Sequence, residues 1–362
     1  MDIRFRKDRL LNSCCIYKSA IECSGLNVDN FFVRRPEFKV TWETINRNAE
    51  EMFRVFPALS EQHTRHNIQS SKERHHVVCV VAYLQDHDYF YDAITSILRQ
   101  TRKPDSIVIG IDNAHQDVAS QDLRLASRAL ESAGIHVSTE LFTGLNGPYH
   151  IFNCIIGKMH DTALLWLHDS DDISHPTRLE KQIAFMDYHQ LDICGSFELR
   201  FDQAGYELFQ YPVNVSRALL IEPGHCMLWP SSLIKASLWR KLGGCSDAYR
   251  FGADTEFQLR ACFIARMGNL PSFLYARRRR SNSLTTSINT GLRSWTRGYI
   301  NSIYKAEYYQ RQMIRSSGNV PVLTPRFSLA SDRSSGERFL EELTDNSANN
   351  YKQTYSPHGS SL

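Results

Sequence analysis

The chain has 362 residues, of which 42% are hydrophobic and 11% aromatic, enough for a substantial core in one large domain or two modest ones. Its formal net charge of +3 is too small to favour a polyanion, so nucleic acid is not an expected partner. The nine cysteines are scattered without a C-x-x-C pair, which argues against a zinc knuckle and favours reduced thiols.

Residues 1–75 are polar and irregular, and we interpret them as an N-terminal extension that is partly helical, with one helix predicted over 41–56. The first residues after Met1 contain charges but no long apolar segment, so they do not resemble a signal peptide. The longest uncharged apolar run, near 77–84, is far below the ~20 residues that a spanning helix needs. We therefore expect a cytoplasmic protein, with attachment to the inner face of a membrane left open.

From residue 76 the sequence alternates between two patterns. Continuous apolar, β-branched runs predict strands buried on both faces, and apolar residues at three- and four-residue spacing predict helices. In chain order the predicted elements are strand 77–83, helix 89–100, strand 106–112, helix 121–133, strand 135–142, helix 148–160 and strand 163–168. This alternation predicts an α/β fold with a Rossmann-like, doubly wound and mostly parallel sheet, which binds ligands at the carboxyl ends of its strands.

After residue 190 the pattern is mixed and predicts an α+β half. The elements expected there are strands near 192–200, 206–211 and 225–230 and helices near 235–241 and 254–267. We place the main domain at 76–290 and a C-terminal helical segment at 291–327. The remainder, 328–362, is rich in Ser and Asn and is predicted to be disordered.

An acidic cluster follows the fourth predicted strand, in LLWLHDSDDISHPTRLEKQ. Asp169, Asp171 and Asp172 fall within four residues, and like charges that close raise one another's pKa unless a positive group compensates. Mg²⁺ or Mn²⁺ is a natural compensation, because both prefer oxygen ligands. The structural alternative is that one aspartate caps the helix that begins near Pro176. Both can hold, with Asp172 structural and the D-x-D pair binding metal.

A second acidic segment, FGADTEFQLR, places Asp254 and Glu256 at the start of a predicted helix. Acids in a first turn also simply complement the helix dipole. Further on, YARRRRSNSLT contains four consecutive arginines, Arg277–Arg280. Such a run is commonly a solvated face, but arginine forks also suit phosphate oxygens or anionic lipid headgroups.

Four segments together resemble family 2 glycosyltransferases, which are inverting enzymes of the GT-A fold. They are VVCVVAYLQDHDYFYDAITSILRQT, IVIGIDNAHQD, LLWLHDSDDISHPTRLEKQ and GADTEFQLRACFIARMGNLPSFLYARRRRSNSLT, and they cover roughly residues 76–285 in order. The first is generic, whereas the third and fourth are specific in combination. The resemblance implies a nucleotide-sugar donor, by family a UDP-sugar, a Mn²⁺ or Mg²⁺ cofactor, and a glycan or lipid-linked acceptor.

On the donor side the resemblance implies roles for particular residues. Tyr83 and Asp112 would hold the base and ribose, and Asp169 would face the ribose and, with Asp171, the metal-bound diphosphate. The chain departs from the family after the first two strands, where it reads AYLQ and IDNA rather than a Pro–Asn pair and two acids before Gly-Ser. These departures leave the nucleotide open.

The resemblance also implies residues at the reacting end. Asp254 matches the catalytic base, with Glu256 as a substitute or acceptor contact, and His225 lies where relatives shape the acceptor pocket. Arg278 or Arg280 would contact the diphosphate. In an inverting transfer the base must face the donor from the side opposite the leaving group, so it comes from a different segment than the metal ligands.

Two alternatives stay open at this point. The altered base-binding segments favour a non-catalytic nucleotide-sugar binder or an assembly subunit of a glycan-synthesis system, whereas the intact Asp169, Asp171 and Asp254 argue against it. Nucleotidyl transfer would normally require a Gly-rich basic loop after the first strand, which YLQDHD at 83–88 lacks.

Overall fold

The computed structural model describes residues 75–325, apart from 85–88, 113–120, 145, 203–204, 248–249 and 282. The predicted extension 1–75, except for its last residue, lies outside the described residues, and so do its helix and the predicted tail 328–362. The predicted domain boundaries therefore stay predictions.

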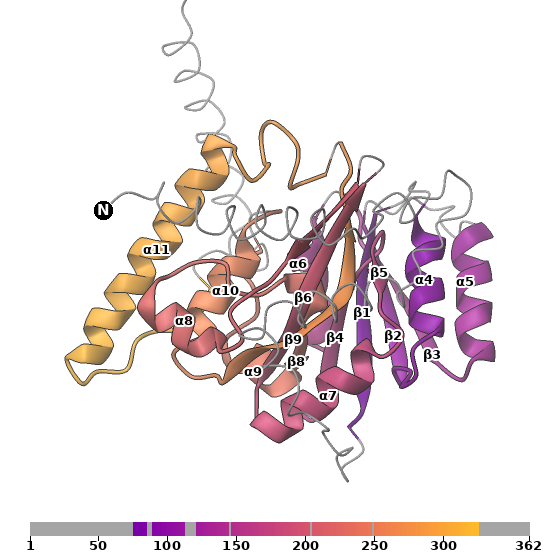
Figure 1. Ribbon diagram of the computed structural model, residues 1–362, viewed down its shortest axis with the longest axis horizontal. Coiled ribbons are helices and arrows are strands. Elements are labelled where there is room, and N and C mark those ends of the chain that lie inside the picture. The colour runs from indigo at the N-terminus through magenta and orange to yellow at the C-terminus, as the bar shows by residue number, and fades with distance from the viewer. Residues whose placement is uncertain are drawn as a thin grey trace, which may run out of the picture.

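The described residues form one sheet with helices packed on it (Figure 1). Its strands are β1 (Val77–Leu84), β2 (Ser106–Asp112), β3 (His136–Leu141), β4 (Leu164–Asp169), β5 (Ile173–Ser174), β6 (Ile193–Asp202), β7 (Gly205–Phe209), β8 (Leu233–Lys235) and β9 (Met267–Arg278). Its helices are α4 (Phe90–Leu98), α5 (Gln121–Ser132), α6 (Pro148–Ile156), α7 (Arg178–His189), α8 (Val215–Ile221), α9 (Ala236–Lys241), α10 (Ala253–Ala261) and α11 (Trp295–Ser316), with a 3-10 turn, η2, at Trp229–Ser231.

The strand order is β3-β2-β1-β4-β8-β6-β9-β5, with β7 paired to β6. Strands β3, β2, β1 and β4 are parallel neighbours, as are β6 and β9, while β8 joins the two groups in antiparallel pairing. The predicted α/β class with a mostly parallel sheet is confirmed. Because the chain steps outward from β1 to β3 and then returns to β4 on the other side of β1, the strand order reverses between β1 and β4. Ligands of such sheets bind at this point.

Strand β1 is buried on both faces, as its unbroken apolar run predicts. Val78 and Val80 join the core cluster that contains residues of α6, α10 and α11, whereas Val77, Cys79 and Val81 join the cluster that contains residues of α4, α5 and α7. The sheet thus has a helical layer on each face. Among the described helices, none is long and apolar enough to cross a bilayer.

One predicted strand, 225–230, is wrong. That segment instead leads into η2, and the strand that follows it is β8. Pro230 explains the difference, because it has no backbone N–H to donate to a neighbouring strand. Helix α8 was not predicted from the sequence. The Asn214 side chain caps it by accepting a hydrogen bond from the Arg217 N–H (2.9 Å).

A buried arginine fixes the end of β4 against its surroundings. Arg178, fully buried on α7, donates hydrogen bonds to the carbonyls of Leu167 (2.9 Å) and Pro230 (3.0 Å). Its guanidinium lies over the rings of Trp166 and Tyr275, at 4.6 and 4.8 Å. Burial lowers its pKa to about 10, so the group stays charged at neutral pH.

We expect Arg178→Ala to lower the free energy of unfolding by ~3–5 kcal/mol, because it leaves buried carbonyls without donors and opens a cavity. Urea unfolding followed by circular dichroism measures this difference. The exposed Arg99→Ala is the matched control and should change stability by less than ~0.5 kcal/mol. Equal stabilities of the two variants would contradict the structural role of Arg178.

Candidate functional site

A pocket of about 620 Å³ opens at the carboxyl ends of β1, β2 and β4, where the strand order reverses. Its floor includes the ends of these strands and the start of α6. Asp254 and His225 line its far wall, and the hydroxyl-rich segment around Ser283–Thr290 lines another. Most of the predicted site residues, from both halves of the sequence, therefore lie around one cavity.

The three aspartates after β4 form the acidic side of this pocket. Oxygen atoms of Asp169, Asp171 and Asp172 all lie within 4.8 Å of one another. Burial, reinforced by Asp171, raises the pKa of Asp169 to about 7, and burial raises the pKa of Asp172 well above its usual range. Ionising Asp169 or Asp172 is therefore costly without a cation nearby.

The hydrogen bonds of the Asp172 carboxylate show whether the cluster fits a divalent cation. Its Oδ1 accepts a hydrogen bond from the Arg278 backbone N–H (2.7 Å), but its buried Oδ2 has no hydrogen-bond partner. Buried carboxylate oxygens are rarely left without a partner. Together with the three-acid set, this orphaned oxygen fits an oxygen-preferring cation such as Mg²⁺ or Mn²⁺.

The four arginines of the basic run are held by acids rather than forming a solvated face. Arg278 pairs with Asp92 (2.8 Å) and lies over Tyr89 (4.0 Å), so its guanidinium is directed toward α4. Arg280 pairs with the Asp171 carboxylate (2.5 Å), and Arg279 pairs with Asp202 (3.1 Å). Both predicted diphosphate contacts line the pocket, although the Arg278 guanidinium is also engaged by Asp92 of α4 and by the carbonyl of Asp171.

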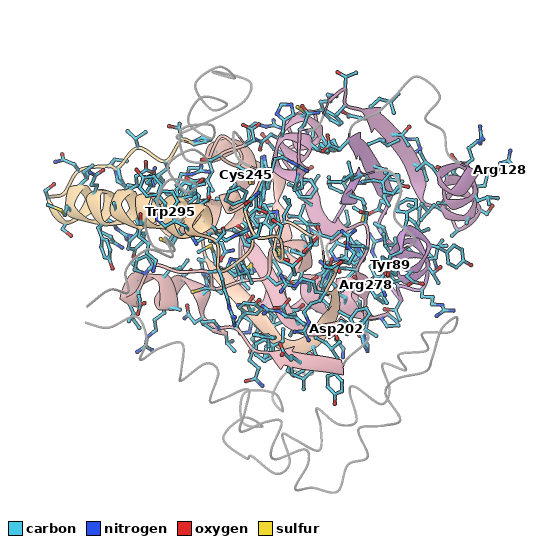
Figure 2. All side chains as sticks on the ribbon, turned by 90° about the horizontal axis from the view of Figure 1, so that it is seen from above. Tyr89, Arg128, Asp202, Cys245, Arg278 and Trp295 are labelled. Atoms are coloured by element: carbon cyan, nitrogen blue, oxygen red, sulfur yellow. The ribbon has the colours of Figure 1, made fainter. Side chains whose placement is uncertain are left out.

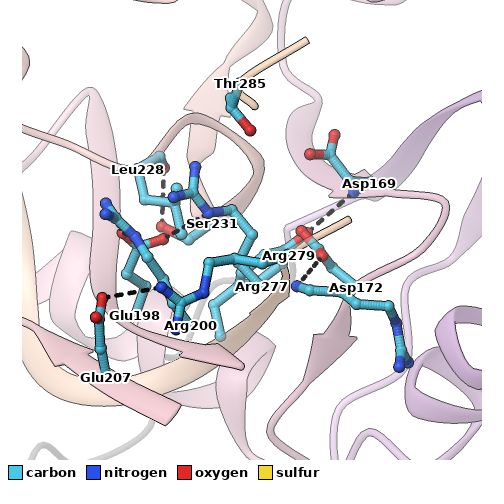
Figure 3. Close-up of polar contacts among 12 residues, drawn as sticks. Asp169, Asp172, Glu198, Arg200, Glu207, Leu228, Ser231, Arg277, Arg279 and Thr285 are labelled. Atoms are coloured by element: carbon cyan, nitrogen blue, oxygen red, sulfur yellow. Dashed lines mark hydrogen bonds and ion pairs between the residues drawn. The ribbon is translucent and has the colours of Figure 1, made fainter. Parts of the chain in front are cut away.

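Arg277 is one of the arginines lining the pocket for which the sequence analysis predicted no role. Its Nε lies 3.2 Å from Oε2 of the buried Glu198, which also pairs with Arg200. Figure 3 shows Arg277 between this pair and the side of the pocket that holds Asp169 and Asp172. Although burial alone would raise it, the pKa of Glu198 is lowered by Arg277 and Arg200. Alternation along β9 predicts that Arg277 and Arg278 face opposite sides, but not which one faces the pocket.

Asp254 lines the same pocket as the acidic cluster. It lies in the first turn of α10, after Gly252, whose φ of 82° makes the turn into the helix. Its Oδ1 accepts a hydrogen bond from the Thr255 N–H (2.9 Å), and its Oδ2 lies 3.6 Å from Nδ1 of His225. Asp254 is close enough to Asp169 to help raise the pKa of that carboxyl, after burial and Asp171. The second acid is thus on the same cavity but on a different element.

His225 lies beside Asp254, with 36% of its side chain exposed. Its Nδ1 is also 3.2 Å from the Thr255 hydroxyl. Burial lowers the pKa of His225 although Asp254 opposes this, so the imidazole is mainly neutral at neutral pH. His225 therefore lines the same pocket as Asp254, and its contact with an acceptor stays a prediction.

Glu256, predicted as a substitute base or acceptor contact, does not face the pocket. It is 1% exposed and forms a two-point ion pair with Arg260, through Nε (2.5 Å) and Nη2 (2.7 Å). Arg260 in turn donates to the carbonyl of Gly244 (2.7 Å). Helical spacing explains the difference, because residues two apart on a helix point in different directions. Glu256 is a structural acid.

Asp112 and Tyr83 both line the pocket, but the Asp112 carboxylate is already hydrogen-bonded to the backbone before α6. Its Oδ1 accepts from the Asn146 N–H and its Oδ2 from the Gly147 N–H, both at 2.8 Å. Gly147 has a φ of 85°, which allows the turn that leads into α6. Tyr83 is 5% exposed and packs on Phe90, with ring centroids 4.5 Å apart. Nucleotide contact by either residue stays a prediction.

The comparison with known families matches the first half of the described chain. Residues 75–210 match the model of a family described as glycosyltransferase like family 2. This region contains the three aspartates and ends before Asp254. An uncharacterized glycosyltransferase of Methanocaldococcus jannaschii is 26% identical over 171 residues, which are 46% of this chain and 57% of that protein. The match thus spans little more than half of the relative's length.

Solved glycosyltransferase structures are similar to this chain at low identity. TarS of S. aureus, residues 1–349 with UDP-GlcNAc, is 18% identical over 57% of this chain and 59% of its own, with a TM-score of 0.47. The mannosyltransferase PcManGT of Pyrobaculum calidifontis, with GDP-Man and Mn²⁺, is 12% identical over 85% and 84%, with a TM-score of 0.44.

The raised pKa of Asp169 predicts how stability changes with pH when no divalent cation is present. The folded protein binds a proton that the unfolded chain releases near its ordinary pKa of 3.8, so stability falls as pH rises from about 4 to about 7. We expect Asp169→Asn to melt at a higher temperature than the wild type at pH 8 in EDTA, and this advantage to shrink toward pH 5. Thermal unfolding across this range measures it.

Asp161→Asn, at the amino end of β4, is the control, because that side chain is 55% exposed. An advantage of Asp169→Asn that is the same at pH 5 and pH 8 would contradict the buried, proton-binding carboxyl.

Proposed function

We propose that this protein is a glycosyltransferase that moves a sugar from a nucleotide-diphosphate donor to a hydroxyl of a glycan or glycolipid acceptor, with inversion. The observation that carries the proposal is that Asp169, Asp171 and Asp172 share one pocket with Asp254, which faces them from another element. The match of residues 75–210 to a glycosyltransferase family supports the same class. Because the relatives are matched only in part, substrates and partners belong to the proposal.

The acidic side is proposed to receive the donor's diphosphate. Asp169 and Asp171, with the orphaned Asp172 oxygen close by, would hold Mn²⁺ or Mg²⁺, and such an ion supplies charge stabilisation to the departing diphosphate. Arg277 and Arg280 face the same space and can donate to phosphate oxygens. Arg280 would then exchange its contact with Asp171 for one with the donor.

On the opposite wall Asp254 is proposed as the general base. The acceptor hydroxyl loses its proton to Asp254 Oδ2 as its oxygen bonds to the anomeric carbon, while the bond from that carbon to the diphosphate oxygen breaks and the electron pair leaves with the nucleotide. The hydrogen bond from the Thr255 N–H occupies Oδ1 and orients the carboxylate. His225, whose Nδ1 lies 3.6 Å from Oδ2, would contact the same acceptor.

A second candidate is a non-catalytic nucleotide-sugar binder. Two observations favour it: Arg280 occupies the Asp171 carboxylate, and both oxygens of Asp112 are engaged by the backbone before α6. Neither observation involves Asp254. The enzyme and the non-catalytic binder can therefore be distinguished by whether Asp254 supports turnover.

The first test is a thermal-shift panel of nucleoside diphosphates, including UDP and GDP, with Mn²⁺ and with EDTA. A ligand at a hundred times its dissociation constant should add ~2.7 kcal/mol of stability. We expect one nucleotide, by resemblance UDP, to stabilise the protein with Mn²⁺ only, and Asp171→Asn to remove the Mn²⁺-dependent part. Asp161→Asn should leave it intact. No Mn²⁺-dependent shift with any nucleoside diphosphate would overturn the proposed donor site.

The second test uses Asp254→Asn and the sugar nucleotide selected by the panel. We expect release of nucleoside diphosphate to fall ~10²–10⁴-fold, because the base is lost, while the donor-induced thermal shift is retained. Retained release with retained binding would show that Asp254 is not the base. If the wild type itself binds the donor but releases nothing with any hydroxyl acceptor, the binder is favoured.

A further inference from the structure

Helix α11 has an apolar face on each side. Its inner face packs into the core through Ile300, Tyr304 and Tyr308, which are 1–2% exposed. Its outer face carries a stripe at alternating four- and three-residue spacing, composed of Trp295, Tyr299, Ser302, Ala306, Tyr309 and Met313, all exposed. This is the spacing at which two helices pack side by side.

The larger members of this outer stripe are too exposed for an ordinary surface helix. Trp295 and Tyr299 are 44% and 41% exposed, and their rings stack at 5.2 Å. Tyr309 is 54% exposed and Met313 is 73% exposed. None of the six positions is charged. Large contiguous apolar patches on soluble proteins commonly mark interaction sites.

The order of the residues along the stripe suits a second copy of the same helix. The stripe is symmetric about position 304: Trp295 and Met313 are nine residues from it, Tyr299 and Tyr309 are five, and Ser302 and Ala306 are two. When two copies of the helix cross antiparallel at this point, each residue meets its counterpart on the other copy. Such self-complementarity is the requirement for a two-fold interface between identical chains.

The sizes also suit that arrangement. Ser302 and Ala306 are small and lie at the centre, where the two helix axes approach most closely. The bulky residues lie toward the ends, where Tyr299 would meet the partner's Tyr309, and Trp295 would meet the partner's Met313. Methionine sulfur packs favourably against aromatic rings.

We propose that the outer stripe of α11 is a homodimer interface, in which two copies of this chain pack α11 antiparallel about a two-fold axis at Tyr304. The three aromatic side chains leave on the order of 300 Å² accessible, against about 800 Å² per partner in a standard interface. This area is smaller than that of a standard interface, so we expect the dimer to dissociate on dilution.

The mass of the full chain in solution tests the interface without any substrate. We expect light scattering after size exclusion to show a dimer at high micromolar concentration that dissociates on dilution. Tyr299→Glu with Tyr309→Glu should raise the dissociation constant at least about tenfold, because aromatic contacts are replaced by buried carboxylates. Both tyrosines are exposed, so unfolding curves should match those of the wild type.

The control is Tyr91→Glu on α4, where the side chain is 79% exposed. Figures 1 and 2 place α4 and α11 at opposite ends of the molecule. A wild-type chain that is monomeric at every concentration, or a dimer that the α11 variant leaves intact, overturns the proposal. A dimer broken equally by Tyr91→Glu does so as well.

Cysteine cross-linking tests the antiparallel register. In a background with Cys14, Cys15 and Cys23 replaced by serine, Ser302→Cys and Ala306→Cys proteins are prepared separately and mixed under oxidation. The described native cysteines are buried, except for the half-buried Cys154. We expect the mixture to form a disulfide-linked dimer more than either protein alone. Efficient cross-linking of Ser302→Cys with itself would indicate parallel helices and overturn the two-fold arrangement.

Discussion

The pocket depends on how three carboxylates are kept together at the end of β4. Asp169, Asp171 and Asp172 lie within 4.8 Å of one another, and burial raises the pKa of Asp169 and of Asp172, which makes the ionisation of these two costly. Arginine from β9 and the segment after it provides the compensation: the Arg278 N–H binds Asp172, and Arg280 pairs with Asp171. Strand β9 reaches this point because it pairs in parallel with β6 and, near its end, in antiparallel fashion with β5.

This balance of charge favours a ligand that carries both positive and negative charge. Arg277 is already shared with Glu198, and Arg280 with Asp171, so a free anion or a free cation would break an existing pair when it bound. A diphosphate bound with a divalent cation replaces both partners at once, the cation at the aspartates and the phosphate oxygens at the arginines. The paired charges therefore support a metal-bound diphosphate over either component alone.

The sequence was sufficient where structure is set locally. The strands and helices from 77 to 169 each carry their own periodicity, and Asp169–Asp172 and Asp254 come together because they end or begin elements at one edge of the sheet. Contacts that depend on distant parts of the chain could not be predicted from the sequence. The face of the sheet from which Arg277 and Arg278 project depends on the register of β9 against β6, which shifts between Ser196 and Glu198. Glu256 pairs with Arg260 only four residues away, but the carbonyl of Gly244, which Arg260 also binds, comes from outside that helix. The strand predicted at 225–230 failed because Pro230 interrupts it.

Placement of the proposed base depends on packing outside the sheet. Asp254 lies in the first turn of α10, which packs against the inner face of α11. In the first turn of α11, Arg297 donates to the carbonyls of Thr290 (2.7 Å) and Leu284 (2.8 Å), and its guanidinium lies 4.9 Å from the ring centroid of Phe251. One helix thus supports both the base and the hydroxyl-rich wall of the pocket. A partner on its outer stripe would restrain α11 from the other side, and with it the distance between Asp254 and the acidic cluster.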